Sequence, residues 1–324
     1  MAARRHIVIA SPASARENNG NWQTASRWAH FLEESHRVDI VGEWRPGETA
    51  PDLLIALHAR RSARSVEQFR AAFPERPILL VLTGTDLYRD IDTTPEARAS
   101  LDRANALVVL QETAPARLPP QLRARTRVIY QSAPTLPPAP AEPGHFDICM
   151  IGHLRPEKDP LTFMRAAALT TDPRVRLLHI GGALDPALEQ AARATGAAAP
   201  RYRWLGPLPH AQARARLAAC RAMAITSTME GGANVIIEAV TSGVPVLASH
   251  IEGNRGMLGA DYAGYFALGD AGALAALIDR LARDAAFEAL LRRQCAARAS
   301  LFAPAAEQAA LADLVDNLLR ARAP

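Results

Sequence analysis

The sequence predicts an α/β protein with two Rossmann-like, doubly wound domains, and three observations lead to this prediction. First, 324 residues are too many for one typical domain, because domains average about 150 residues. Second, short apolar runs alternate with helical patterns, which is typical of parallel sheets that helices cover on both faces. Third, the proline-rich stretch 132–145 cannot sustain a helix or a central strand, so it predicts a linker between two similar halves.

The amino-terminal domain is predicted to span residues 1–140. Its first apolar run, His6 to Ala10, is too short for the core of a signal peptide and is therefore predicted as a strand. The other strands are expected at 37–41, 52–57, 77–82, 106–110 and 127–130. Helices are expected at 22–34, 65–73 and 95–104.

The carboxy-terminal domain is predicted to span residues 141–303 and repeats the pattern. Its strands are expected at 147–152, 175–181, 202–206, 222–226, 245–249 and 265–268. Helices are expected to begin at Leu161, Pro186, His210 and Asn234, with two more between 271 and 300. Ligands of open α/β sheets bind beyond the carboxyl ends of the strands, so two such domains that face each other are expected to share a central cleft.

The composition narrows the classes of function. A net charge of +4 without any run of five like charges favours a small anionic ligand over nucleic acid. Cys149, Cys220 and Cys295 form no C-x-x-C pair, which indicates neither a disulfide framework nor a zinc site and fits a reducing cytoplasm. No apolar segment approaches about 18 uninterrupted residues, so no membrane span is expected.

Lys158 is the only lysine in the chain, because every other residue among the 37 lysines and arginines is an arginine. An ammonium is a compact point charge, whereas a guanidinium is a planar fork, so this lysine suggests a site shaped for an ammonium. The alternative is a surface lysine without a special role. Lys158 closes a G-x5-K loop that begins at Gly152, directly after the expected strand 147–152.

A second constellation lies in residues 226–249, which predict a strand, a loop, a helix and then Gly243 as the helix stop. Gly231 and Gly232 allow the backbone to approach a ligand, and the helix start favours a phosphate. Glu230 and Glu238 are spaced E-x7-E, and a carboxylate can accept hydrogen bonds from two vicinal hydroxyls. The alternative is a loop cap and a solvated helix residue. Together with Lys158, the glycine-opened helix start would form a diphosphate cradle that needs no metal.

These motifs resemble the retaining family 4 glycosyltransferases of the two-Rossmann-domain GT-B fold, and the segment "EAVTSGVPVLAS" extends the resemblance. The resemblance implies that Lys158 holds the donor diphosphate and Glu238 the nucleoside ribose. It assigns the donor sugar to Glu230 and to the backbone of Gly231, Gly232, Ala233 and Asn234.

Two further details follow from the same resemblance. The family's arginine after the glycine is His153 here, and Arg155 is the candidate to replace it. The final helix, at 304–324, is expected to pack back on the first domain.

The amino-terminal stretches "NNGNWQTASRW", "ALHARRSARS", "LTGTDLYRDI" and "VIYQSA" resemble one subgroup, the selenosugar synthases of selenoneine biosynthesis. This resemblance implies transfer of a sugar from UDP-N-acetylglucosamine or UDP-glucose to selenophosphate, which gives a 1-seleno sugar, UDP and phosphate without a metal or other cofactor. It also implies that a selenophosphate synthetase supplies the acceptor and a selenoneine synthase takes the product.

Candidate acceptor residues follow three of the expected strands. His58, Arg60 and Arg61 come after strand 52–57, and Ser62 is expected to cap the next helix, so a phosphate-like anion could dock there. The alternative for the arginines is an exposed basic face. Two other sets complete the candidates: Asn18, Gly20 and Asn21, which otherwise form a plain turn, and Thr83, Thr85 and Asp86. Relatives carry a histidine where Thr83 stands, so that histidine's role is not transferred.

Other motifs are weaker. Asp90 and Asp92 spell D-x-D but are interpreted as an acidic loop pair, and no G-x-G-x-x-G supports a dinucleotide oxidoreductase. Two alternatives to a selenosugar synthase stay open. One is a family 4 transferase with a hydroxyl acceptor, and the other is a sugar-nucleotide binding protein without turnover.

Overall fold

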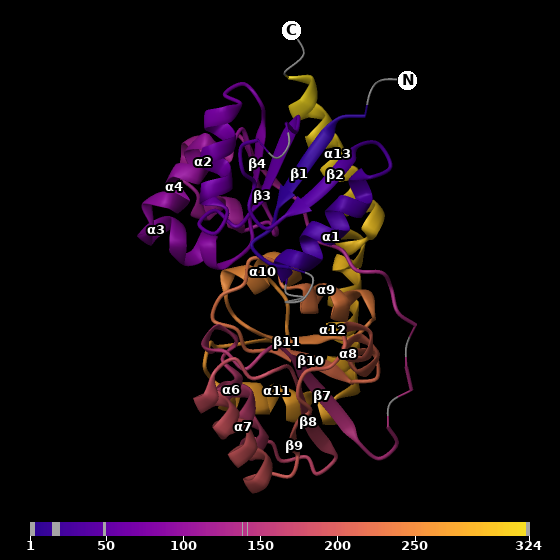
Figure 1. Cartoon of the computed structure of the whole chain (residues 1–324). Coiled ribbons are helices and arrows are strands. Elements are labelled where there is room, and N and C mark those ends of the chain that lie inside the picture. The colour runs from indigo at the N-terminus through magenta and orange to yellow at the C-terminus, as the bar shows by residue number, and fades with distance from the viewer. Residues whose placement is uncertain (1–3, 15–19, 48–49, 138, 141, 322–324) are drawn as a thin grey trace. The chain divides into compact units, whose positions relative to one another are not determined.

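The structure is a computed structural model that describes residues 4–14, 20–47, 50–137, 139–140 and 142–321. The chain divides into two compact units (Figure 1). Unit 1 comprises residues 1–131 and 304–324, and unit 2 comprises residues 132–303. The sequence placed the boundary at 140/141 instead. The first linker residues belong to unit 2 because they bond to it: the Ala133 N–H donates to the carbonyl of Phe302, and Arg214 donates to the carbonyl of Pro134.

Unit 1 contains a parallel six-stranded sheet in the order β2-β1-β3-β4-β5-β6. The strands are β1 (His6–Ala10), β2 (Arg37–Val41), β3 (Leu53–Leu57), β4 (Ile78–Leu82), β5 (Ala106–Val109) and β6 (Thr126–Val128). The helices are α1 (Gly20–Leu32), α2 (Ala63–Ala72), α3 (Ile91–Thr93), α4 (Pro95–Arg103), α5 (Pro120–Arg123) and α13 (Pro304–Arg320). A π-helical turn η1 (Asp86–Asp90) and a 3-10 turn η2 (Ala114–Arg117) complete the unit.

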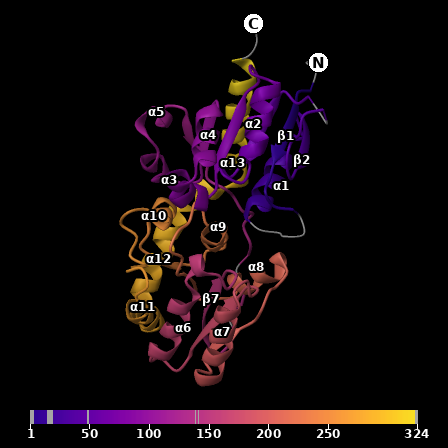
Figure 2. The ribbon, with the colours of Figure 1, turned by 60° about the vertical axis from the view of Figure 1, so that its left-hand side comes forward.

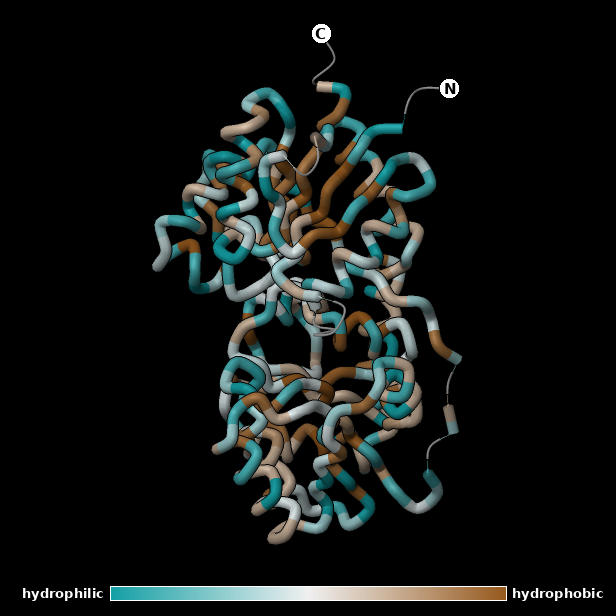
Figure 3. Tube along the Cα trace, viewed as in Figure 1, coloured by the Kyte–Doolittle hydropathy of each residue, from teal (hydrophilic) through white to brown (hydrophobic). Residues whose placement is uncertain are grey.

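The two faces of this sheet bury alternate residues of the same strands. Leu54 and Ala56 of β3 pack with Phe69 of α2, whereas Leu53 and Ile55 pack with helices α1 and α13. Helices therefore cover both faces, and the strands need to be apolar on both sides. Figure 3 shows this as brown, hydrophobic strands at the centre of the unit.

Helix α13 is held in unit 1 by one buried carboxylate as well as by apolar contacts. Glu307 accepts hydrogen bonds from the guanidinium of Arg27 at 2.7 Å and from the indole of Trp28 at 2.7 Å. Leu311 and Val315, one turn apart, join the apolar cluster that contains Trp28. The last helix thus packs on α1, although the two lie far apart in the sequence.

Unit 2 contains a second parallel six-stranded sheet, in the order β12-β11-β10-β7-β8-β9. The strands are β7 (Phe146–Ile151), β8 (Val175–Ile180), β9 (Tyr202–Trp204), β10 (Ala222–Ile225), β11 (Val246–Ser249) and β12 (Tyr265–Phe266). The helices are α6 (Pro160–Leu169), α7 (Pro186–Ala198), α8 (His210–Ala218), α9 (Asn234–Thr241), α10 (Glu252–Leu258), α11 (Ala271–Arg283) and α12 (Ala285–Arg298). Two 3-10 turns are η3 (Pro156–Lys158) and η4 (Ala299–Phe302). Helix α6 lies beside α7 (Figure 2) and α11, and α9 lies beside α8 and α12.

The strand order of each sheet fixes where a ligand can bind. The chain winds outward from β1 in both directions in unit 1 and from β7 in both directions in unit 2. The loops after β1 and β3, and those after β7 and β10, therefore flank the points where the order reverses. Ligands of open α/β sheets bind at such points.

The predicted fold class is confirmed, because each half forms a parallel sheet flanked by helices. The short helices α3 and α5, the turns η1, η2, η3 and η4, and the helix α10 were not predicted. Helix α10 contains Gly253 and Gly256, which are poor helix formers, so its residues gave no helical signal. No helix in the described part of the chain combines the length and the apolar character that crossing a bilayer requires.

Candidate functional site

The loop after β7, residues 152–159, is here called the lysine loop. It contains the turn η3 and ends at Asp159, which takes the left-handed backbone conformation and caps α6 through the Thr162 N–H. The turn folds Lys158 back over the start of the loop, so that a Cβ at Gly152 would lie 3.5 Å from the lysine Cγ. The aliphatic part of the lysine is thus supported along its length.

The loop after β10, residues 226–233, is here called the glycine loop, and it contacts the lysine loop directly. Lys158 Nζ lies 2.5 Å from Glu230 Oε1, and the two side chains are only 16% and 11% exposed. The backbones are joined as well: the Thr226 hydroxyl donates to the carbonyl of Lys158 at 2.7 Å, and the Thr228 N–H donates to that of Glu157 at 2.9 Å. The two predicted constellations therefore form one site.

The helix start beside this ion pair offers free backbone donors. The N-cap of α9 is Ala233, which supplies no side-chain cap. Among the described residues, no acceptor receives the backbone N–H groups of residues 231–235. Such a row of free N–H groups at the positive end of a helix favours a phosphate or another anion. The helix ends as predicted at Gly243, which has a φ of 69°.

Helix α10 fixes the glycine loop from one side through Gly253. A Cβ at this position would lie 2.0 Å from the carbonyl oxygen of Glu230, so only glycine permits the approach. Sequence reasoning missed this contact because Gly253 lies in a different strand–helix connection from Glu230.

Glu238 lies on the first turns of α9 and has a partner that the sequence did not indicate. Its Oε1 lies 2.6 Å from Nε2 of His210, the first residue of α8. The carboxylate is mostly buried, whereas the imidazole is about half exposed. A lone histidine at a helix start carries no motif, so no signal in the sequence could have found this pair.

His153 does not supply the charge of the family arginine whose place it takes. Its Nδ1 accepts a hydrogen bond from the Gly182 N–H at 3.0 Å, so the proton of the neutral ring sits on Nε2. Partial burial, together with the positive charges of Arg155 and Lys158, lowers the pKa of His153. The exposed guanidinium of Arg155 has no hydrogen-bonding or ion-pair partner among the described residues. Arg155 therefore remains the candidate cation of this loop.

His179, on β8, hydrogen-bonds to the backbone at the start of the lysine loop. This buried ring donates from Nε2 to the carbonyl of Gly152 at 3.1 Å, and its Nδ1 accepts from the Tyr202 hydroxyl at 2.9 Å. Both nitrogens are used in the neutral form, and burial lowers the pKa of His179 to about 4. Protonation would place a second proton on Nδ1, so the ring could no longer accept the hydrogen bond from the Tyr202 hydroxyl.

This buried histidine predicts an acid-sensitive unit 2. The ordinary pKa of 6.5 applies in the unfolded chain, so between pH 6.5 and about 4 the unfolded state binds a proton that the folded state does not. Stability therefore falls as the pH falls, by about 2 kcal/mol between pH 7 and pH 5. We expect His179→Gln to flatten this slope, measured by hydrogen exchange of unit 2, whereas the exposed control His250→Gln keeps it. An unchanged slope in His179→Gln would contradict the assignment.

The candidate acceptor residues of unit 1 meet at the β3 and β4 loops, but Asp86 has a different role from the one predicted. Its fully buried carboxylate accepts from the N–H groups of Ala59, Thr83, Gly84 and Leu87 at 2.8–3.2 Å. These bonds tie the two loops together, so the oxygens of Asp86 face the backbone and not a ligand.

His58 joins the same two loops through its ring. It is buried, has a φ of 72°, accepts the Arg61 N–H on Nδ1 and lies 3.0 Å from the Thr85 hydroxyl through Nε2. The proton is therefore on Nε2, and the Thr85 hydroxyl is left to donate outward. Burial is the largest cause of the lowered pKa of His58.

The two arginines of this loop, Arg60 and Arg61, differ in whether a carboxylate pairs with them. The guanidinium of Arg60 donates to Asp90 at 2.7 Å, so this arginine is paired with a carboxylate of the turn after β4. The guanidinium of Arg61 is exposed and has no partner among the described residues.

Ser62 stands at the N-cap of α2, but the predicted cap is wrong. Its hydroxyl donates instead to the carbonyl of Leu57, and this bond closes the turn after β3. Gly20 and Asn21 begin α1. Asn18 lies outside the described residues.

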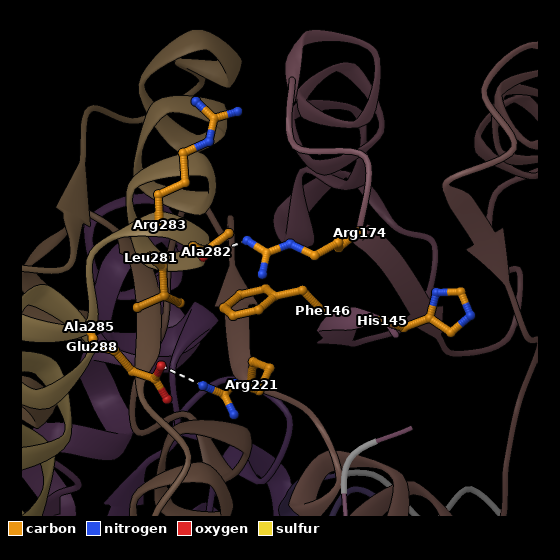
Figure 4. Close-up of a pocket in the computed structure, with 9 residues that line it drawn as sticks. All are labelled: His145, Phe146, Arg174, Arg221, Leu281, Ala282, Arg283, Ala285 and Glu288. Atoms are coloured by element: carbon orange, nitrogen blue, oxygen red, sulfur yellow. Dashed lines mark hydrogen bonds and ion pairs between the residues drawn. The ribbon is translucent and has the colours of Figure 1, made fainter. Parts of the chain in front are cut away.

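A cavity of about 320 Å³ occupies the opposite edge of the unit 2 sheet, where residues such as His145, Arg174 and Arg221 precede the strands. Figure 4 shows Phe146 between Arg174 and Arg221. Arg174 binds Asp172 at 2.8 Å and Arg221 binds Glu288 at 2.6 Å. Arg221 directly precedes β10 and pairs with Glu288 of α12, and Arg174 also donates to the carbonyl of Ala282 in α11 at 2.7 Å. These contacts join the strand ends to helices, so we assign the cavity a structural role. The described residues contain no cluster of three or more His, Cys, Asp or Glu side chains that could hold a metal ion.

Comparison with known proteins identifies a family and a fold. Residues 136–319 match the family described as glycosyl transferases group 1. The chain is similar to HepE of Anabaena, solved in complex with UDP and glucose, with 18% identity and a TM-score of 0.74 over 97% of this chain and 100% of that one. It is similar to sucrose-phosphate synthase of Thermosynechococcus elongatus, with 18% identity and a TM-score of 0.78 over 98% and 100%.

A third similar structure is the pneumococcal O-GlcNAc transferase GtfA, in complex with UDP and GlcNAc, at 16% identity and a TM-score of 0.67 over 82% of this chain and 57% of that one. At these identities the three structures establish a shared fold, which is the two-domain GT-B fold.

Proposed function

Since this chain belongs to the glycosyl transferases group 1, we propose that it transfers a sugar from a UDP-sugar to selenophosphate, with retention of configuration and without a metal. The observation that carries the donor half of the proposal is the contact of Lys158 with Glu230 beside the free N–H groups of α9. HepE, in complex with UDP and glucose, and GtfA, in complex with UDP and GlcNAc, support a UDP-sugar with glucose or N-acetylglucosamine as the donor.

The Lys158–Glu230 pair sets the order of events at the donor site. A diphosphate carries more negative charge than one carboxylate, so it draws the ammonium away from Glu230. The released carboxylate can then accept hydrogen bonds from hydroxyls of the donor sugar. Glu238, whose Oε2 has no partner among the described residues, can receive the ribose hydroxyls. Lys158, Glu230 and Glu238 thus each gain a ligand partner when the donor binds.

The chemistry then depends mainly on stabilising charge. The bond between C1 of the sugar and the β-phosphate oxygen breaks, and selenium forms its bond to C1 on the same face. The electron pair of the broken bond stays on the phosphate, where Lys158 and the start of α9 stabilise it. Selenophosphate is already a soft anion, so it needs no strong general base. Water then attacks phosphorus and cleaves the Se–P bond, which releases phosphate and leaves a proton for the selenol.

The acceptor half of the proposal depends on the loops after β3 and β4. Arg61 provides a cation without a partner in the part of the chain that the structure describes, and Thr85, held by His58, provides a hydroxyl donor. Arg61 follows β3, which flanks the point where the strand order reverses, and a cation with a hydroxyl donor in the adjoining loop suits a small phosphate-like anion. We therefore take Arg61 and Thr85 as contacts of selenophosphate and leave Asp86 and Arg60 as their structural supports.

One incubation tests the function. The protein is mixed with UDP-N-acetylglucosamine or UDP-glucose and with selenophosphate, and mass spectrometry detects the seleno sugar while phosphorus NMR follows UDP and phosphate. We expect one UDP and one phosphate for each seleno sugar, with the α configuration of the donor kept. UDP release with hydroxyl acceptors but never with selenophosphate would contradict the acceptor. Binding of the donor without turnover on any acceptor would contradict an enzyme.

A further inference from the structure

His210 is a contact of Glu238 that the proposed reaction does not yet use. The Nε2–Oε1 distance of 2.6 Å marks a strong hydrogen bond, and since a carboxylate only accepts, the imidazole donates. The other oxygen of Glu238, Oε2, has no hydrogen-bond partner in the described part of the chain. One oxygen is therefore fixed by the protein and the other is open to a ligand.

The helix that carries His210 is itself anchored. Arg214 lies one turn further along α8, on the same face as His210, and is only 6% exposed. Its guanidinium donates to the carbonyl of Pro134 at 2.5 Å, and the Ala213 N–H donates to that of Pro209 at 2.9 Å. Helix α8 also packs against α9, which carries Glu238. The backbone of helix α8, from which the His210 imidazole extends, is therefore held in place.

A glutamate without such a support would sample several rotamers and lose that freedom when a ligand binds. His210 removes this loss in advance because it holds the carboxylate in one orientation. We propose that His210 is a positioning residue for Glu238 and sets the preference of the site for a nucleotide with an intact ribose diol. This inference rests on the proposed function, in which Glu238 binds the ribose of the donor.

Calorimetry with UDP, 2′-deoxy-UDP and 3′-deoxy-UDP tests the inference on the full chain. We expect His210→Ala to bind UDP about tenfold more weakly, because the carboxylate of Glu238 loses the hydrogen bond that holds its orientation. The preference for UDP over the deoxy nucleotides should shrink by the same factor. His210→Gln, whose amide can donate to the same oxygen, should recover part of both. The control is Gln212→Ala, an exposed residue of the same helix, which should bind as the unaltered chain does.

The outcomes separate this inference from the function on which it rests. If Glu238→Gln binds UDP with unchanged affinity, the donor site itself is wrong. If Glu238→Gln weakens UDP but His210→Ala does not, only the role of His210 is overturned. It is also overturned if His210→Ala weakens UDP and the deoxy nucleotides equally, because a merely structural histidine would act that way. In kinetics, a positioning role for a ground-state contact predicts a raised donor KM with a nearly unchanged kcat.

Discussion

Lys158→Ala lowers the turnover number by about two to three orders of magnitude at saturating donor, because removal of a preorganised charge partner of the transition state costs a few kcal/mol. The ammonium is the only lysine of the chain, and it lies 2.5 Å from Glu230 beside the free N–H groups of α9. In the proposed reaction it meets the charge that gathers on the β-phosphate as the sugar leaves. Lys158→Arg should also lower turnover, because the guanidinium fork is larger than the ammonium and differs in reach.

The control for charge is Arg165→Ala. Arg165 is an exposed cation on α6, the helix that directly follows the lysine loop, and among the described residues its guanidinium hydrogen-bonds only to Thr162, at 3.3 Å. This variant should keep nearly full turnover. Circular dichroism checks that both variants fold, since Lys158→Ala also leaves Glu230 without its partner. A folded Lys158→Ala protein with a turnover number near that of the unaltered chain would show that the cradle is misassigned.

The contact between the lysine loop and the glycine loop was largely predictable because its signals are local. Lys158 and Glu230 each follow an apolar strand, and strands of one parallel sheet end at the same edge, so their loops had to lie near each other. The strand order adds what the sequence does not state: β7 and β10 are neighbours, although β8 and β9 lie between them in the chain. This pairing places the two loops in contact.

The features that escaped prediction depend on contacts between segments that are distant in the sequence. Asp86 resembles a site residue in a threonine- and glycine-rich loop, but its carboxylate accepts from N–H groups of its own loop and from that of Ala59 in the neighbouring loop. His210 gains meaning only from Glu238, which lies in the next helix along the chain. A titratable residue in a loop can therefore be recognised from sequence, but whether it faces the ligand or the backbone is decided by tertiary packing.

Gly253→Ala tests the packing beneath the glycine loop, and we expect it to lower turnover by about a hundredfold. The added Cβ would lie 2.0 Å from the carbonyl oxygen of Glu230 and 2.9 Å from its carbonyl carbon. Real carbon atoms do not approach backbone atoms so closely, and the packed interior cannot absorb the overlap, so the loop must move. A shift of about 1 Å in a catalytic group typically costs about a hundredfold in rate.

The matched control is Gly196→Ala, in helix α7 of the same unit. Its Cβ would lie 3.8 Å from the nearest atom, the carbonyl oxygen of Tyr202, which is an ordinary contact. This variant should keep full turnover and gain about 0.5–1 kcal/mol in stability, because alanine has the higher helix propensity. The turnover of each variant is measured per folded molecule, together with its melting temperature. If Gly253→Ala remains folded and turns over as fast as Gly196→Ala, then the position of Glu230 does not depend on α10, and the two loops alone hold the site together.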